Sequence, residues 1–278
     1  MRITLDGTPI DYHERGDGPP LLLLPGGAGH AGVFDGLAAH LADDYRVVAM
    51  SSRLVSARPD GDQSPKAYAE DVLGLIDALF DEPPAVFAFS AGAITTLDLL
   101  ARHPERVRLA VVHEPPVFGL LPDADRHRAA IEAVRAAART GDLAEASRLM
   151  TEAMTAPGPG AATPELRHPG DWLEGYAETS PEPPTPELLE LFGRLSELQP
   201  LFLEHVLVPF TSMDVDLAAL GPRLVPAAGI DSRGQLPYRA AAALAAALGL
   251  PLTELPGGHL GPVERPTQFA AALRALLG

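Results

Sequence analysis

The sequence predicts an α/β protein with a mostly parallel, doubly wound sheet. Short apolar runs alternate along the chain with helical segments of about 10 to 15 residues, which is the pattern of strand–helix–strand crossovers. One longer segment, residues 119–205, interrupts this alternation. A length of 278 residues suits one such domain carrying an insertion, because single cores stop growing near roughly 250 to 300 residues.

The N-terminal part is expected to open with a hairpin and to continue as a parallel sheet. Residues 2–5 and 8–14 flank Asp6-Gly7, a dipeptide suited to the positive φ angles of a tight turn. The apolar run 21–24 is typical of a strand buried on both faces of a parallel sheet. Right-handed crossovers then connect strands expected at 45–50, 85–89 and 108–113 through helices near 31–42, 65–80 and 92–103.

Residues 119–205 break the alternation with helix-prone stretches at 124–140, 143–154 and 186–207, which are separated by loops rich in Pro and Gly. The segment leaves the sheet at the carboxyl end of a strand, where open α/β sheets bind their ligands. We therefore expect a helical cap, or lid, over a core made of residues 1–118 and 206–278, with an annex on a sheet edge as the alternative. The alternation resumes with strands at 223–228 and 252–255 and with helices near 237–249 and 266–277.

The composition argues against several classes of protein. No apolar run approaches the roughly 18 residues of a membrane span, so we expect a soluble protein without a membrane partner. A formal charge of −16 without a dense Lys/Arg run argues against nucleic acid. The N-terminus lacks the features of a secretory signal, which favours a cytoplasmic location. The absence of cysteine excludes thiolate catalysis. The expected partner is a small-molecule substrate, and a homodimer is left open.

Ser90 is the main candidate for a nucleophile. It lies between an apolar strand and a predicted helix in the run 86–93, Val-Phe-Ala-Phe-Ser-Ala-Gly-Ala. A sharp strand–turn–helix connection holds such a serine with its hydroxyl above the sheet, and small flanking residues let helix and strand approach. The run fits the Gly-x-Ser-x-Gly pattern of this nucleophile elbow, with Ala88 at the first position, where a small residue is needed.

Four segments together resemble the α/β-hydrolase superfamily, and in particular a group of small actinobacterial serine hydrolases. They are Phe-Ala-Phe-Ser-Ala-Gly-Ala-Ile at 87–94, His-Glu-Pro-Pro at 113–116, Gly-Gln-Leu-Pro-Tyr-Arg at 234–239 and Pro-Gly-Gly-His at 256–259. The resemblance covers nearly the whole chain. It implies an α/β-hydrolase fold with an inserted helical cap, and catalytic residues in the order serine, acid, histidine.

His259 is the expected general base, because it follows the last predicted strand in a Pro-Gly-Gly loop that can carry an imidazole over the strand ends. The acid that orients this imidazole is expected to be Asp231, which follows the strand at 223–228, where the family usually carries it. Asp231 stands two residues after Gly229, whereas relatives commonly have a spacing of three. Glu114 and Asp214 are therefore kept as alternatives.

An oxyanion hole is expected from backbone N–H groups near Ser90. One donor is Ala91, at the start of the helix, and the second is Gly27 or Gly26 in the glycine-rich stretch after residue 24. Many relatives have a histidine where Pro25 stands, a change that alters the surroundings of the loop without removing its donors.

Several other residues are candidates for the substrate pocket. The loop 51–56 lacks the acid and the glycines that relatives often carry there. One interpretation is that the sequence of a surface loop has changed without consequence, and the other is that Arg53 or Ser52 lines a reshaped pocket. Glu114 lies at the carboxyl end of a predicted strand, near the expected crevice. Trp172 and Phe210 are large side chains of the predicted cap and its return, where core packing is the alternative to ligand contact.

The leading functional hypothesis is a serine hydrolase that cleaves a carboxylic ester, thioester or lactone of a small apolar molecule through an acyl-serine intermediate. This reaction requires no metal or organic cofactor. Hydrolysis of a C–C bond, or a cofactor-free cyclisation or rearrangement in secondary metabolism, remains open because the same residues can serve it. A non-catalytic receptor with a lidded pocket is the alternative from a different class.

Overall fold

A computed structural model of the chain describes residues 1–156 and 186–278. In this part of the chain one eight-stranded sheet has the order β1-β2-β4-β3-β5-β6-β7-β8. The first two strands are antiparallel to their neighbours and all others pair in parallel. The strands are β1 (Arg2–Leu5), β2 (Thr8–Arg15), β3 (Pro20–Leu24), β4 (Arg46–Met50), β5 (Ala85–Phe89), β6 (Leu109–His113), β7 (Leu224–Gly229) and β8 (Thr253–Leu255).

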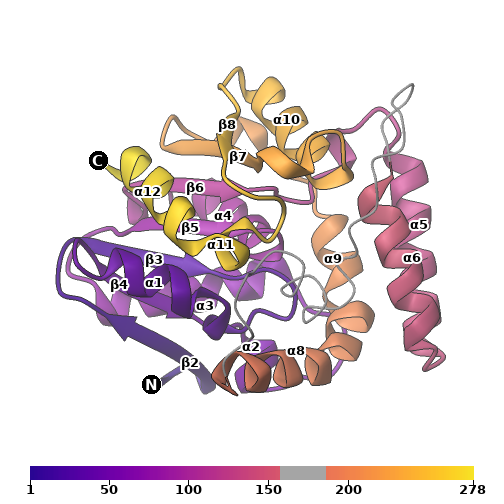
Figure 1. Cartoon of the computed structure of the whole chain (residues 1–278), viewed down its shortest axis with the longest axis horizontal. Helices are drawn as coiled ribbons and strands as arrows, with labels where there is room; N and C mark the ends of the chain where they lie inside the picture. The colour runs from indigo at the N-terminus through magenta and orange to yellow at the C-terminus, as the bar shows by residue number, and fades with distance from the viewer. Residues whose placement is uncertain (157–185) are drawn as a thin grey trace.

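Alternate residues of the central strands face two separate cores. Leu22 and Leu24 of β3 belong to one apolar cluster, whereas Leu21 and Leu23 belong to the other, as the two-residue period of a strand requires. The first cluster includes residues of α3 (Pro65–Leu79), α4 (Ala91–Arg102) and α10 (Leu236–Leu248), and the second includes residues of α1 (Asp35–Leu41) and α12 (Pro266–Leu277). Helices therefore cover both faces, and the predicted doubly wound sheet is confirmed (Figure 1).

Short elements refine the connections between strands. The helix expected near 31–42 is divided into a 3-10 turn, η1 (Ala31–Phe34), and α1, while α2 (Arg53–Ser56) occupies the loop after β4. Further short elements of the sheet connections are η2 (Pro104–Arg106), η5 (Ile230–Ser232) and α11 (Gly261–Glu264).

The chain between β6 and β7 is mainly helical where the structure describes it. Its described elements are η3 (Phe118–Leu120), α5 (Ala124–Arg139), α6 (Leu143–Thr155) and α8 (Pro186–His205), followed by α9 (Leu207–Thr211) and η4 (Leu217–Ala219). Helices α5 and α6 pack side by side, and α9 contacts both α5 and α4 of the core (Figure 1). None of the helices described is long and apolar enough to cross a membrane.

Candidate active site

The backbone turns sharply at Ser90, between β5 and α4. Ser90 has φ 53° and ψ −122°, a conformation that costs a residue with a side chain about 1 to 3 kcal/mol. Its N–H donates to the His113 carbonyl at 3.0 Å, and its carbonyl accepts from the Ala93 N–H at 3.0 Å. Ser90 therefore stands at the end of a buried strand in the strained turn that a nucleophile elbow needs.

Two glycines let neighbouring backbones approach this turn. A Cβ atom at Gly92 would lie 2.4 Å from the Leu24 carbonyl oxygen, and one at Gly26 would lie 2.6 Å from Ser90 Cβ. The start of α4 thus packs directly on the end of β3. Gly26, one of the two candidates for the second oxyanion donor, lies against the serine side chain itself.

His259 lies in the loop after β8, beside the residue that precedes Ser90. Its ring packs edge-on against Phe89, with 6.1 Å between ring centroids and an interplanar angle of 73°. Its Nδ1 lies 2.7 Å from Glu114 Oε2. With Nδ1 donating to this carboxylate, Nε2 is the nitrogen left for another partner.

Glu114 directly follows β6 and is fully buried, with φ 49°. Its second oxygen, Oε1, accepts the Gly229 N–H at 2.9 Å and also the hydroxyl of Ser232. Burial by itself would raise the pKa of the Glu114 carboxyl, but the hydrogen bonds with His259 and Ser232 outweigh it and place the pKa below its ordinary value. Glu114 is thus held as a carboxylate whose two oxygens are both engaged.

A second imidazole supports the same loop. His113 is completely buried, and its Nε2 lies 3.2 Å from the carbonyl oxygen of Gly258, next to His259. Burial lowers the pKa of His113, which favours the neutral ring with its proton on Nε2. Its Nδ1 has no hydrogen-bond partner among the described residues. The sequence offered no signal for this contact, because residues 113 and 258 are distant along the chain.

The structure does not place Asp231 at His259, which corrects the preferred assignment of the acid. The Asp231 side chain is 46% exposed and pairs with Arg265 at 2.7 Å. Asp231 and Ser232 both lie in η5, and successive residues of a 3-10 turn point about 120° apart, so Ser232 rather than Asp231 faces Glu114. Asp214 lies in the exposed stretch after α9. Of the three carboxylates considered, Glu114 is the one in contact with His259.

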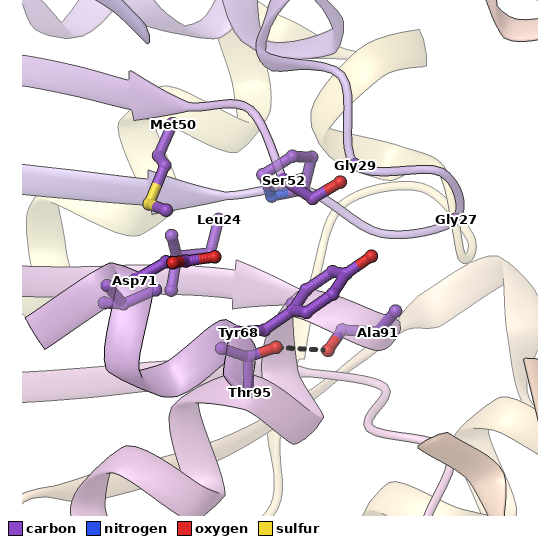
Figure 2. A pocket seen from close by; sticks show the side chains of 12 residues that line it. Leu24, Gly27, Gly29, Met50, Ser52, Tyr68, Asp71, Ala91 and Thr95 are labelled. Atoms are coloured by element: carbon purple, nitrogen blue, oxygen red, sulfur yellow. Dashed lines mark hydrogen bonds between the residues drawn. The ribbon is translucent and has the colours of Figure 1, made fainter. Parts of the chain in front are cut away.

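Gly27 and Ala91 meet at one small cavity. We refer to residues 25–29 as the glycine loop; within it the Gly29 N–H donates to the Gly26 carbonyl at 3.0 Å. Because a trans peptide directs its C=O and N–H to opposite sides, the Gly27 N–H points out of this turn. The N–H of Ala91, in the first turn of α4, has no partner within the helix. Both residues line a cavity of about 30 Å³ (Figure 2).

The loop 51–56 lies beside this cavity, and one of its two candidate residues lines it. Ser52 lines the cavity, whereas Arg53 does not and instead forms a bidentate pair with Asp71, at 2.6 and 2.7 Å. Tyr68 and Asp71 of α3 also line the cavity, and sequence reasoning missed both. Their signal would have been their place in the first two turns of α3, since such turns lie at the carboxyl edge of a doubly wound sheet.

Of the two large side chains predicted to line the pocket, the structure describes one. Phe210 of α9 is buried and stacks edge-on with Tyr68, with 5.0 Å between ring centroids, so it packs against a cavity-lining residue rather than lining the cavity. Trp172 lies outside the described residues.

The sheet order and the helices on both of its faces are those of the α/β-hydrolase fold. A family model of the α/β hydrolase fold matches residues 19–150. The Bacillus subtilis (strain 168) protein called uncharacterized hydrolase YraK is 30% identical over 281 residues, covering 99% of this chain and 94% of the relative. The chain therefore belongs to the α/β-hydrolase family. The finer resemblance to actinobacterial members stays a prediction.

Two further comparisons concern proteins with named substrates. A zearalenone hydrolase of Cladophialophora bantiana is 26% identical over 96% of this chain and 92% of the relative. The crystal structure of the enol-lactonase from Burkholderia xenovorans LB400 superposes with a TM-score of 0.71 at 17% identity, covering 100% of this chain and 99% of that one. The latter similarity confirms the predicted α/β-hydrolase fold.

Proposed function

We propose that this hydrolase cleaves a carboxylic ester, thioester or lactone of a small apolar molecule through an acyl-Ser90 intermediate. In this proposal His259 is the general base and Glu114 is the carboxylate that orients it. The observation that carries the proposal is the 2.7 Å contact between His259 Nδ1 and buried Glu114, beside a serine held in a strained turn. Lactones are favoured within this class because the zearalenone hydrolase and the enol-lactonase are named for such substrates.

The proposed reaction uses Ser90, His259 and Glu114 in turn. Ser90 Oγ attacks the carbonyl carbon while His259 Nε2 accepts the hydroxyl proton, and Glu114 stabilises the imidazolium that forms. The negative charge that develops on the carbonyl oxygen is stabilised by the N–H groups of Gly27 and Ala91. The C–O or C–S bond then breaks as His259 returns a proton to the leaving group. Water, activated by the same histidine, releases the acid and restores Ser90.

The helical insertion of residues 119–205 acts in this proposal as the lid over the bound substrate. Its support is positional, because the insertion leaves the sheet after β6, directly beyond Glu114. Open α/β sheets bind ligands at these strand ends.

The proposal is tested by labelling and turnover. A fluorophosphonate probe should label the wild-type protein at Ser90, as located by peptide mass spectrometry. Ser90→Ala should abolish both labelling and the hydrolysis of p-nitrophenyl esters, aryl thioesters and macrocyclic lactones. His259→Ala should abolish turnover while the protein stays folded by circular dichroism. A wild-type protein that binds such lactones but neither labels nor turns them over would instead support the receptor hypothesis.

A further inference from the structure

Ser52 holds the glycine loop by two hydrogen bonds to successive carbonyls. Its hydroxyl donates to the Ala28 carbonyl at 2.8 Å, and its backbone N–H donates to the Gly29 carbonyl at 2.7 Å. Ser52 directly precedes α2 and is fixed from the other side by β4, so both donors come from a well-anchored segment. The two bonds therefore join the end of the sheet to the loop that carries Gly27.

The contact between Ser52 and the loop is also tight. Gly29 has φ +81°, and a Cβ atom built there would lie 2.5 Å from both Cβ and Oγ of Ser52. On the far side, the hydroxyl of Tyr68 faces Ser52, and Figure 2 shows the Tyr68 ring between Ser52 and Ala91. Burial raises the pKa of this phenol, which therefore stays neutral. Ser52 is thus enclosed between the glycine loop and Tyr68.

The glycine loop needs such external support. Three of its five residues are glycines, which have the greatest backbone freedom to lose when the loop is ordered. One internal hydrogen bond, from the Gly29 N–H to the Gly26 carbonyl, shapes the turn. It does not tie the turn to the rest of the sheet, whereas the two bonds from Ser52 join Ala28 and Gly29 to the segment that follows β4.

We propose that Ser52 is a positioning residue for the oxyanion hole: it sets the location of the Gly27 N–H relative to that of Ala91. This inference rests on the proposed function of those two groups as donors to the substrate oxygen. Preorganised donors stabilise the transition state only where they are already aimed at the developing charge. A loop that loses its anchor must be reordered in every reaction cycle, which affects the transition state more than the bound substrate.

Ser52→Ala removes the hydroxyl bond and leaves the backbone bond in place. We expect kcat to fall about tenfold, less than the roughly 100- to 1000-fold that follows loss of an entire oxyanion donor, while KM stays within about twofold. Affinity for a trifluoromethyl ketone, whose adduct with Ser90 carries the tetrahedral oxyanion, should fall by a similar factor. Affinity for the planar product acid should not change.

Ser51→Ala is the matched control. Ser51 is also buried, and its hydroxyl accepts the Ala31 N–H at 3.0 Å, outside the glycine loop. Removing it breaks one buried hydrogen bond next to Ser52, so the thermal midpoint should fall for both variants. Only Ser52→Ala should weaken binding of the ketone. Equal kinetic losses in the two variants would show a general effect of stability and overturn the proposal.

Amide hydrogen exchange tests the anchor without requiring turnover. In Ser52→Ala the amides of Gly29 and Ser52 should exchange about tenfold faster than in the wild type, with Ser51→Ala unchanged at these positions. Unchanged exchange, or unchanged kcat together with unchanged ketone affinity, contradicts the role assigned to Ser52. If the wild-type protein neither labels nor turns over esters, the proposed function fails, whereas the exchange measurement still decides whether Ser52 anchors the loop.

Discussion

His259 Nδ1 lies 2.7 Å from Glu114 Oε2, across 145 residues of sequence. The carboxylate belongs to the residue directly after β6, and the imidazole lies in the loop after β8. Because Glu114 is completely buried and its other oxygen is engaged by Gly229 and Ser232, it cannot easily turn to another partner. The histidine is therefore held by a group that is itself rigidly held.

Replacing Glu114 by Gln should lower kcat on the order of 10⁴-fold, because the amide favours the wrong tautomer of His259 and no longer stabilises the imidazolium. Steady-state kinetics on an activated ester would measure this. Asp231→Asn is the matched control, since Asp231 is half-exposed and pairs with Arg265, and its activity should stay within about threefold of the wild type. A large loss in Asp231→Asn with a small one in Glu114→Gln would return the role to Asp231.

The acid stability of the protein should also depend on Glu114. Its pKa in the folded state lies below the ordinary value of 4.5, so its ionised form stabilises the fold. That contribution is fully present above about pH 4.5 and is lost as the pH falls through the lower, folded-state pKa. The difference in unfolding free energy between wild type and Glu114→Gln, from urea titrations, should therefore shrink between pH 6 and pH 3. A difference independent of pH would contradict this.

Much of the fold could be predicted from sequence because apolar runs and helix starts are local signals. The strand expected at 85–89 has those bounds, and α5 and α6 agree with expectation to within one residue. The one long helix expected at 186–207 instead ends at His205, and a separate helix begins at Leu207. Pro209 gives a local reason for this break that the prediction overlooked: a proline has no N–H to donate, and its ring clashes with the carbonyl four residues before it, here His205, which accepts the Gln63 N–H at 2.8 Å instead.

The site was less predictable because it depends on side-chain direction. Ser90 and His259 could be chosen as candidates from the turns in which they lie. The choice between Asp231 and Glu114 depends on whether Asp231 or Ser232 points inward from η5. Similarly, Ser52 and Arg53 are adjacent, yet one faces the cavity and the other pairs with Asp71. Neither distinction can be made without knowing how each short turn is rotated.

Gly92→Ala should destabilise the protein and lower activity together. The added methyl would lie 2.4 Å from the backbone carbonyl of Leu24, so α4 must move away from β3, with an expected cost of about 1 to 3 kcal/mol. Gly193→Ala is the control: it lies in α8 with open space around its Cβ, and alanine there should stabilise by about 0.5 to 1 kcal/mol. Thermal unfolding would show whether the two substitutions change the stability in opposite directions, and ester turnover would show whether only Gly92→Ala lowers the activity.

The helical insertion is fastened to the core through Arg239 of α10. Its guanidinium donates to Asp123, just before α5, at 2.6 Å, and both side chains are only 14% exposed. Arg239→Gln should cost about 1.5 to 3 kcal/mol, as expected for loss of a charge-assisted hydrogen bond with little solvent access. Limited proteolysis should then cleave within the insertion faster than in the wild type, because its anchor to α10 is weakened.

The matched control for this anchor is Arg128→Gln. Arg128 and Asp125 form a salt bridge on the surface of α5, with side chains 58% and 96% exposed. Its loss should cost no more than about 1 kcal/mol and leave the proteolysis rate unchanged, because both partners lie on the same helix. Urea unfolding of the two variants measures the contrast. Equal costs would mean that Arg239 does not fasten the insertion to α10, and that the apolar contacts of α5 with α8 and α9 hold it instead.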